Sequence, residues 1–387
     1  MKKKILIVYS KSTAEVFNRQ SALGSYIHCL SQIFVKNGYD VQINDTPFDQ
    51  VPAEHTVPAA GVGSSSALKK MVPAFIKEYM KDQKLFRQME QLLAKIDTGG
   101  GFDKILEFYT YGSDLGYRLS KKYNRELVLV YDNPVLEEHS FFYKGQLFFK
   151  NKIERLEKQS LLQAGAIVVY SAAVQKYLEK KLNTTLPCFI HQNVDYTRFE
   201  FVEEKNTGET INIGFIGSFL KWHRVDLLVN AFTRLRSEGK QVKLFLLGKG
   251  MEFQQVKEQV KQNKYAEAIE MPGFADGEQL FNYKKQIDIG VMPGSNWYGA
   301  PNKIFEYGAA KMAVVAPGTP TINHLFRDGE ELSIFKQDDE NELYDKLKAY
   351  IEDAALLSRH AAALQSKVRN EYSEKNTFDF YNRLLTP

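Results

Sequence analysis

The segment "APNKIFEYGAAKMAVVAP" (residues 300–317) contains a lysine and a glutamate three residues apart, Lys303 and Glu306. The segment predicts a helix that begins at Pro301, since proline favours the first helical position, and that leads into a buried strand. Lys303 then lies in the first turn, where the positive end of the helix dipole disfavours a cation by about 0.3–1 kcal/mol. The plain interpretation is a surface ion pair with Glu306 on the same helix face. The alternative is an anion site, because a lysine at a helix N-terminus concentrates the positive potential that a diphosphate requires.

Three glycine-containing turns in the second half of the chain follow apolar runs. They are "GFIGSFLKWHRVD", "LLGKGMEF" and "MPGSNWYGAPNKIFEY". Glycine lets a backbone approach a ligand closely, and the helix N-termini that follow offer unpaired N–H groups to an anion. Each turn alone is a weak signal, but three on the same edge of one domain favour a ligand that bears phosphate.

The turns must be held by strands and helices, and the apolar runs of the first half predict which ones. Strands are expected at "KILIVYS", "DVQIND", "FDKILEFYT", "RELVLVYD" and "GAIVVYS", with a helix over "ALGSYIHCLSQIFVKNGY". Runs this apolar are typical of strands covered on both faces, as in a parallel α/β sheet.

The second half repeats the alternation. Strands are expected at "INIGFIGS", "VKLFLLGKG", "IEMPGF", "DIGVMPG" and "AVVAPG", with a helix at "VDLLVNAFTRLRSEG". The fold class is therefore α/β with two doubly wound domains, and the polar segment 191–211 is the expected linker. The ligand crevice of such sheets lies beyond the carboxyl ends of the strands, so two facing edges would form an interdomain cleft.

Length and composition agree with this organisation. The 387 residues exceed one typical core, and 44% hydrophobic with 25% charged residues is usual for a globular protein. Cys29 and Cys188 provide neither zinc spacing nor a disulfide framework, which fits a reducing cytosol. The run after "MKKK" is too short for a signal peptide, and no run approaches a membrane span. We therefore expect a cytoplasmic location.

The net charge of +4 is concentrated in residues 67–95, which hold seven Lys or Arg and three acidic residues. A nucleic-acid-binding domain is usually much more basic, so no nucleic-acid partner is expected. The stretch also contains aromatic and apolar residues. It predicts a pair of amphipathic helices on the first sheet, broken near Pro73, or alternatively a peripheral contact with anionic lipid at the inner face of the membrane.

The motifs together resemble a known family. "PNKIFEYGAAKMAVVA" is similar to the "PxKxxEYxAxGxPVVA" segment of retaining glycosyltransferases of family 4, which have the GT-B fold. "IGFIGSFLKWHRVDLLVNAF", "VVYSAAVQKYL" and "NVDYTRF" resemble further family segments, so the resemblance extends over nearly the whole chain. It implies an acceptor-side domain over 1–195, a nucleotide-sugar domain over 196–370, and a last helix over 371–387 that returns to the first domain.

The resemblance also implies roles for matching residues. Lys303 would contact the donor diphosphate and Glu306 the nucleotide ribose. The remaining donor-site positions are Gly217 and Ser218 beside the phosphates, Gly248 and Gly250 in the nucleotide pocket, Gly273 and Phe274 near the base, and His223 as a polar or basic contact. Gly24 would approach the transferred sugar or the acceptor.

Several positions depart from the family pattern. Tyr298 stands where many members have a second glutamate, which puts the usual sugar contact in doubt. Arg224 replaces a glycine, and is either an additional phosphate ligand or a local change without a role. Lys311 and Ala313 replace the family's glycine and proline, so the turn after this helix differs.

A metal-independent mechanism is expected, because the sequence has no D-x-D triplet to hold a cation on a diphosphate. Lys303, helix N-termini and Arg224 would then stabilise the departing charge, since charge-assisted hydrogen bonds contribute about 1.5–3 kcal/mol each. His139 follows a strand of the first domain. It is either a surface loop residue or a contact to the transferred sugar or the acceptor hydroxyl.

The leading hypothesis is a glycosyltransferase of the hexosyltransferase type. It needs no cofactor besides a nucleotide-diphosphate sugar donor, and it acts on a glycan, lipid-linked or other hydroxyl acceptor in glycan biosynthesis. A nucleotide-sugar epimerase of the same fold and a catalytically inactive binding subunit are the alternatives. The inactive subunit stays an alternative because Tyr298 replaces the usual glutamate, and loss of that glutamate would reduce activity.

Overall fold

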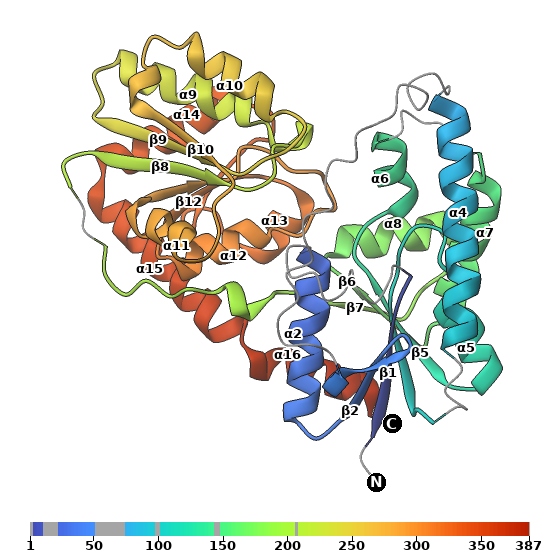
Figure 1. Ribbon diagram of the computed structural model, residues 1–387. Coiled ribbons are helices and arrows are strands. Elements are labelled where there is room, and N and C mark those ends of the chain that lie inside the picture. The colour runs from blue at the N-terminus through green and yellow to red at the C-terminus, as the bar shows by residue number, and fades with distance from the viewer. Residues whose placement is uncertain are drawn as a thin grey trace. The chain divides into compact units, whose positions relative to one another are not determined.

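The computed structural model describes residues 3–10, 22–50, 74–96, 101–142, 148–205 and 208–386. The chain forms two compact units (Figure 1). Unit 1 comprises Met1–Asp195 and Thr377–Pro387, and unit 2 comprises Tyr196–Asn376. The chain thus leaves unit 1 inside the polar segment 191–211 and returns to it at Thr377.

Unit 1 is built on a seven-stranded sheet in the order β3-β2-β1-β4-β5-β6-β7. Neighbouring strands are parallel except for the pair β2 and β3. The strands are β1 (Lys4–Tyr9), β2 (Asp40–Ile43), β3 (Thr46–Pro47), β4 (Lys104–Phe108), β5 (Glu126–Tyr131), β6 (Ala166–Val169) and β7 (Cys188–Ile190). The order reverses between β1 and β4, as in doubly wound folds.

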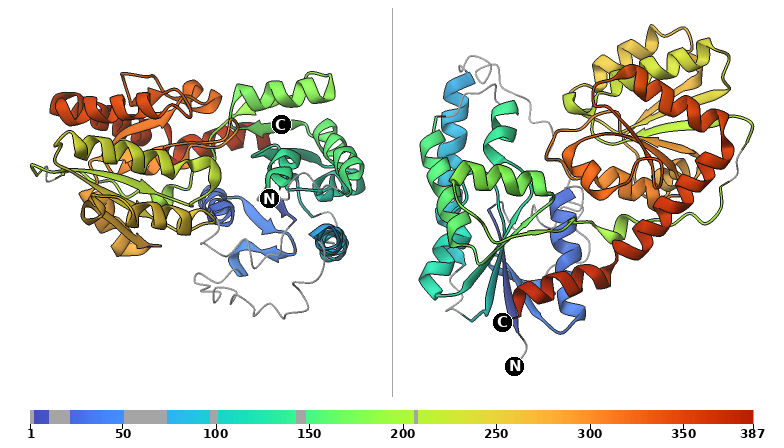
Figure 2. Two further views of the ribbon diagram at one scale, coloured as in Figure 1. Left: turned by 90° about the horizontal axis from the view of Figure 1, so that it is seen from above. Right: turned by 180° about the vertical axis from the view of Figure 1, so that it is seen from behind.

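Helices cover both faces of this sheet. The helices of unit 1 are α2 (Ala22–Lys36), α4 (Ala74–Lys95), α5 (Leu115–Tyr123), α6 (Val135–Phe142), α7 (Lys150–Gln163), α8 (Ala172–Leu182) and α16 (Glu374–Leu385). Tyr381 and Leu385 of α16 are buried in one core with α2 and β1, and the right panel of Figure 2 shows α16 on this side of the sheet. The hydroxyl of Tyr381 donates to Oδ1 of Asn193 at 2.9 Å, which ties α16 to the loop after β7.

Unit 2 is built on six parallel strands in the order β10-β9-β8-β11-β12-β13. They are β8 (Ile211–Ile216), β9 (Val242–Leu247), β10 (Ile269–Gly273), β11 (Ile289–Val291), β12 (Ala313–Pro317) and β13 (Ser333–Phe335). The order reverses between β8 and β11. Both halves therefore have the predicted doubly wound α/β class.

The helices of unit 2 are α9 (Val225–Ser237), α10 (Phe253–Lys261), α11 (Gly277–Gln286), α12 (Asn302–Ala309), α13 (Pro320–Leu325), α14 (Glu340–Glu352) and α15 (Ala354–Glu371). Figure 1 shows α9, α10 and α14 on one face of the sheet and α11 and α12 on the other. The first group packs on β8 and β9 through a single apolar core that includes Phe215, Phe232 and Leu347.

One local prediction needs correction, and another is tested only in part. Pro301 caps α12 from outside, with φ −85° and ψ 49°, so the helix begins at Asn302 and not at Pro301. Lys303 still lies in its first turn. Of the helix pair expected over 67–95, the structure describes one helix, α4. Residues 67–73, with the expected break near Pro73, lie outside the described residues, so the pair stays a prediction.

Candidate functional site

The carboxyl edge of the unit 2 sheet gathers most of the predicted site residues. Gly217 follows β8, Gly248 follows β9, and Phe274 follows β10. α12 begins after the loop that follows β11. Because β8 and β11 are the neighbours at which the strand order reverses, this is the part of the edge where an open α/β sheet forms its ligand crevice.

Lys303 points from the first turn of α12 toward the loop after β8. Its Nζ lies 3.0 Å from Nε2 of His223, and its side chain occupies the space that a Cβ at Gly217 would need. Burial lowers the pKa of the ammonium to about 8. The group is therefore charged at neutral pH, and it is held at a helix start where the peptide dipoles add to its positive potential.

His223 fixes the direction of that lysine. Its Nδ1 lies 2.5 Å from the carbonyl oxygen of Ser218, which can only accept, so Nδ1 carries the proton and Nε2 accepts from Lys303. Burial, with the charge of Lys303 nearby, lowers the pKa of His223 to about 3. The ring is thus neutral, and positive charge at this position comes from Lys303.

Glycines bring the backbones at the ends of β8, β9 and β10 into close contact. A Cβ at Gly248, where φ is +133°, would overlap the carbonyl oxygen of Gly217. A Cβ at Gly250 would lie 2.5 Å from the carbonyl oxygen of Phe219. The N–H of Gly248 donates to the carbonyl of Gly273 at 2.7 Å, so three successive loops form one layer. The contacts that these glycines make in the structure are thus between backbones.

Two glycines let α12 pack closely, Gly290 against the sheet and Gly308 against α15. A Cβ at Gly290 on β11 would lie 2.6 Å from the ring of Tyr307, and one at Gly308 would lie 2.8 Å from Val368 of α15. The hydroxyl of Tyr307 accepts from the N–H of Ile216 at 2.8 Å. The helix that carries Lys303 is therefore fixed to the end of β8.

Glu306 does not form the expected surface pair with Lys303. Its carboxylate lies 3.5 Å from Nζ of Lys284 and 3.7 Å from the guanidinium of Arg198. Lys284 has a side chain only 3% exposed and also pairs with Glu200 at 3.1 Å. The side chain of Glu306 is thus 20% exposed, and the two cations hold its orientation. Its role toward a ribose stays a prediction.

Arg224 is engaged with carboxylates. Its guanidinium lies 3.0 Å from Asp226 and 2.5 Å from Asp338. The residue has φ +47°, in the left-handed region that favours glycine. This explains why a glycine fits the position in the resembling motif. A phosphate contact by Arg224 stays a prediction.

The outer loops provide an aromatic rim. Phe274 is 52% exposed, and Nζ of Lys249 lies 4.5 Å from its ring centroid. Tyr298 is buried, with its ring edge-on to Trp297 at 5.3 Å. Asn296, two residues earlier, has a buried amide oxygen without a hydrogen-bond partner among the described residues. The sequence analysis missed Asn296, and its only signal there was the glycine-flanked loop "GSNWYG".

The two remaining predicted residues belong to unit 1. His139 lies on α6, half-buried, with its ring stacked on Tyr111 at 3.8 Å. Burial, with the charge of Lys81 nearby, lowers the pKa of His139 to about 4, so the ring is neutral at neutral pH. Gly24 lies in the first turn of α2, and the hydroxyl of Ser25 beside it donates to the carboxylate of Asp195.

A buried polar cluster at the carboxyl edge of the unit 1 sheet was missed as a site. Asp132 follows β5, and its carboxylate accepts from the amide of Asn193 at 3.3 Å. Burial raises the pKa of Asp132 to about 6, although hydrogen bonds from Tyr170 and Asn193 oppose the rise. Asp132 and His139 are two of the titratable groups that unit 1 has near the ends of β4 and β5.

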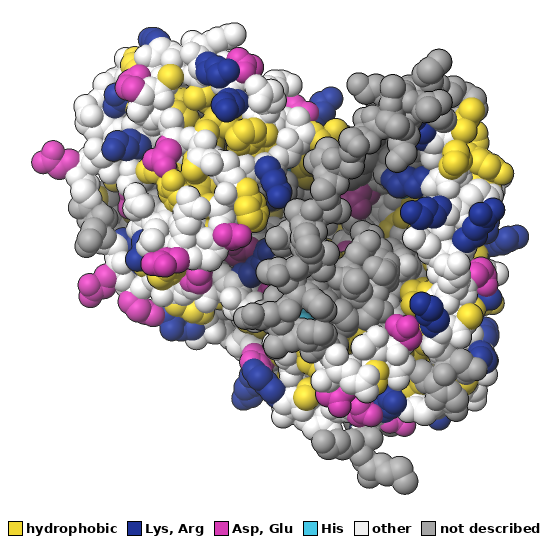
Figure 3. Space-filling model, in the orientation of Figure 1, with side chains coloured by type: hydrophobic (Ala, Val, Ile, Leu, Met, Phe, Trp, Pro, Cys, Tyr) yellow, Lys and Arg dark blue, Asp and Glu magenta, His cyan; other side chains and the backbone are white. Residues whose placement is uncertain are grey.

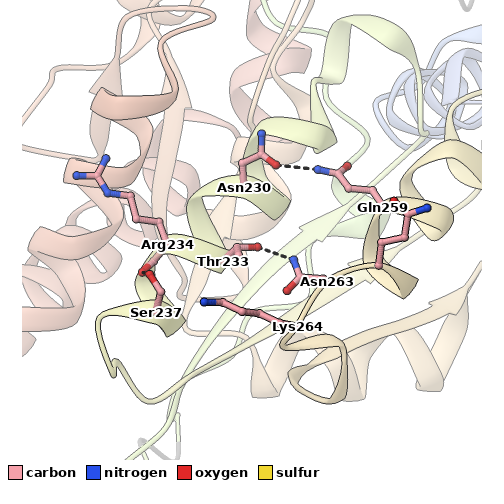
Figure 4. Close-up of a pocket in the computed structure, with 8 residues that line it drawn as sticks. Asn230, Thr233, Arg234, Ser237, Gln259, Asn263 and Lys264 are labelled. Carbon is pink, nitrogen blue, oxygen red and sulfur yellow. Dashed lines mark hydrogen bonds between the residues drawn. The ribbon is translucent and has the colours of Figure 1, made fainter.

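A shallow polar groove of about 550 Å³ lies elsewhere in unit 2, between α9 and α10 (Figure 4). Its side chains bind one another: Gln259 donates to Asn230 at 2.9 Å, and Asn263 donates to Thr233 at 2.5 Å. α10 leads into β10, so this groove lies toward the amino edge of the sheet, away from Lys303. Among the described residues, no three His, Cys, Asp or Glu side chains are grouped so that they could hold a metal ion.

Comparison with known proteins agrees with this reading of unit 2. Residues 210–353 match the family described as Glycosyl transferases group 1. That range contains His223, Lys303 and Glu306, together with the three glycine turns. By sequence, the chain matches no curated protein.

Solved structures are similar over the whole chain. HepE of Anabaena, crystallised in complex with UDP, has 15% identity and a TM-score of 0.69, with 100% of both chains covered. A sucrose-phosphate synthase from Thermosynechococcus elongatus has 16% identity and a TM-score of 0.72, with 99% of both covered. A glycosyltransferase from Rickettsia africae has 14% identity and a TM-score of 0.68, with 99% of this chain and 98% of that one covered. The GT-B fold is thereby shown, and residues 210–353 are the part of the chain that matches the group 1 family.

Proposed function

We propose that the protein is a retaining, metal-independent glycosyltransferase of family 4 that moves a hexose from a nucleotide-diphosphate donor to an acceptor hydroxyl. One observation carries the proposal: a charged lysine at a helix start is held by His223 over the glycine turn after β8. Such a cation costs stability in the free protein. It is useful when a diphosphate departs, because preorganised charge stabilises negative charge that develops in the transition state.

The donor would bind at the carboxyl edge of unit 2. Lys303 and the N–H groups of α12 would contact the diphosphate, and Glu306 would accept from the ribose hydroxyls. Phe274 and the glycine layer would flank the base. UDP is the first nucleotide to test, since HepE was crystallised with UDP and with UDP-glucose.

In the resembling family a second glutamate contacts the transferred sugar. Tyr298 stands at that position and has no carboxylate, so another residue must make the contact. Asn296 is the residue we assign to it, because its buried amide oxygen has no partner among the described residues and the loop follows β11. Asn296→Ala should weaken binding of UDP-glucose about tenfold and leave UDP binding within about twofold, as loss of one buried hydrogen bond predicts. Calorimetric titration with both ligands measures this. Equal weakening of both would contradict a sugar contact.

Unit 1 would receive the acceptor, with His139 and Asp132 as the groups that contact its hydroxyl. The acceptor would be a glycan, a lipid-linked saccharide or another alcohol. The epimerase has no observation in its favour, and the inactive subunit has only the missing glutamate at position 298.

The test measures release of free nucleotide from a panel of nucleotide sugars, with and without candidate acceptors, and with a chelator in one arm. Release that depends on acceptor and persists in chelator supports the proposal. Lys303→Ala should lower turnover by about ten- to a hundredfold, as loss of a charge-assisted contact of about 1.5–3 kcal/mol predicts, and Lys257→Ala on α10 is the matched control. Full activity of the Lys303 variant would overturn the assignment. Binding without release would indicate an inactive subunit, and acceptor-independent epimerisation would indicate the epimerase.

A further inference from the structure

Large hydrophobic side chains are exposed at the N-terminal end of α4. They are Ile76 (37%), Tyr79 (47%) and Met80 (62%), with Phe148 (48%) from the segment before α7. Tyr79 and Phe148 are in contact, with ring centroids 6.2 Å apart. We call these four residues the apolar tip, and Figure 3 shows hydrophobic side chains gathered in this region. Adjoining exposed side chains of this size are typical of an interaction site, unlike single ones.

A stripe of cations lies beside the apolar tip. Exposed residues Lys77, Lys81, Lys84 and Arg87 follow at intervals of four, three and three, which places them along one side of the helix. Figure 3 shows Lys and Arg side chains below the hydrophobic ones. The exposed face of α4 thus combines apolar and basic groups.

The acidic residues of α4 with described side chains do not neutralise that stripe. Asp82 is buried, and Glu90 pairs with Arg118 of α5 at 2.6 Å. Among the described residues, Lys77, Lys84 and Arg87 form no ion pair. Three cations therefore remain available to an external anion.

The apolar tip lies on the side of unit 1 where we place the acceptor. Asp82, in the N-terminal half of α4, accepts from the hydroxyl of Tyr111 in the loop after β4 at 3.4 Å, so this end of α4 lies toward the carboxyl edge of the sheet. That edge also holds Tyr111 and His139, where we place the acceptor. An acceptor delivered from a surface at the tip would therefore arrive at the side of unit 1 that is to receive it.

We propose that the apolar tip and the cation stripe form a docking surface for an anionic lipid bilayer. The aromatic and Met side chains would enter the interfacial region, and the cations would face the lipid phosphates, as in interfacial amphipathic helices. The charge pattern favours this occupant over a second copy of the chain, because the stripe would oppose itself across a symmetric interface. No described helix is long and apolar enough to cross a bilayer, so the contact would be peripheral. Only delivery of the acceptor from this membrane rests on the proposed function.

The test is flotation of the full chain with vesicles of phosphatidylcholine, pure or mixed equally with phosphatidylglycerol. The protein should float with the anionic vesicles, remain behind with the neutral ones, and be released by added salt. Lys77→Glu/Lys84→Glu should lower partition at least about tenfold, because two attractive charges become repulsive. The matched control is Lys176→Glu/Lys180→Glu, which reverses two exposed lysines on α8 of the same unit and should float like the parent.

Met80→Asp tests the apolar part, and it too should lower partition at least about tenfold. Its side chain is exposed, so the unfolding midpoint should stay unchanged and separate lost binding from misfolding. Equal flotation of all variants, or no binding to anionic vesicles, would overturn the proposal. So would a concentration-dependent dimer in light scattering that Met80→Asp dissolves. Lys303→Ala should float normally, so failure of the transferase assignment would not be mistaken for failure of docking.

Discussion

Lys303 combines a charge, a helix start and partial burial, and each of the three has a measurable consequence. Burial lowers the pKa of its ammonium from 10.5 to about 8. The charge is therefore present at pH 7 at a cost to folding. Residues held against their own stability in this way are typical of binding and catalytic sites.

Replacing Lys303 by Met should stabilise the protein. Below pH 8 the lysine is charged in both states, and the lowered folded-state pKa means that the charged form destabilises the fold. We expect the free energy of unfolding to rise by about 1–3 kcal/mol at pH 7, where Met has a similar length without the charge. The gain should shrink as pH rises from about 8 toward 10.5, because the native lysine is then neutral. Urea unfolding at several pH values measures it, and a loss of stability at pH 7 would contradict the burial argument.

The same pKa sets the alkaline limit of donor capture. kcat/KM reports the free enzyme, so it should fall as pH rises through about 8 and Lys303 loses its proton. A bound diphosphate favours the charged form, so the corresponding fall in kcat should lie at higher pH. pH profiles of both constants show the difference. Profiles that fall together, or a kcat/KM that is flat to pH 9.5, would speak against Lys303 as the cation.

His223 acts through Lys303. In the His223→Leu enzyme, Nζ of Lys303 has lost its acceptor, and kcat/KM should fall about tenfold or more. His223→Gln should recover part of this, because an amide oxygen can accept from the lysine. Comparison of the two variants at pH 7 is the measurement. Equal losses would indicate that the ring serves packing against Phe215 and Trp222 instead.

At the scale of elements, the glycine layer can be tested apart from any ligand. Gly248→Ala places a Cβ against the Gly217 carbonyl at φ +133° and should cost about 2–4 kcal/mol of unfolding free energy. Gly239→Ala is the matched control, since its φ is +81° with no atom within 4 Å, and should cost only about 1 kcal/mol. Urea midpoints with unchanged m-values measure both. Equal costs would show that the loops can separate without strain.

The elements differ in how far the sequence predicts them. Long apolar runs such as "KILIVY" and "VKLFLL" predict β1 and β9 because both sheet faces are covered. β3, β7 and β13 have only two or three residues, too few for a periodicity to appear.

The candidate site likewise has parts that the sequence predicts and parts that it does not. Lys303 and His223 were both predicted as site residues from the resembling motifs, but their contact spans 80 positions and depends on where α12 meets the turn after β8. The unpaired amide of Asn296 and the carboxylate pairs of Arg224 depend on side-chain geometry, which spacing in the chain does not specify.

At the scale of the whole molecule, the two units have separate cores and the chain passes between them twice. Unit 1 includes α16, whose Tyr381 is fully buried against Phe34 of α2. Unit 2 has its own core beneath α9 and α14. A change in one core and a ligand of the other unit should therefore act on different parts of the unfolding curve.

Scanning calorimetry of the full chain tests this. Tyr381→Ala should lower the free energy of unfolding of unit 1 by about 3–5 kcal/mol, since it leaves a cavity and removes the hydroxyl that donates to Asn193. UDP at 100 times its dissociation constant should raise the free energy of unfolding of unit 2 by about 2.7 kcal/mol. In the variant the two transitions should move apart, with UDP shifting only the upper one. A single transition that shifts as a whole with UDP would mean that the units unfold together. A UDP shift confined to the lower transition would place the nucleotide in unit 1, and would move the donor site away from Lys303.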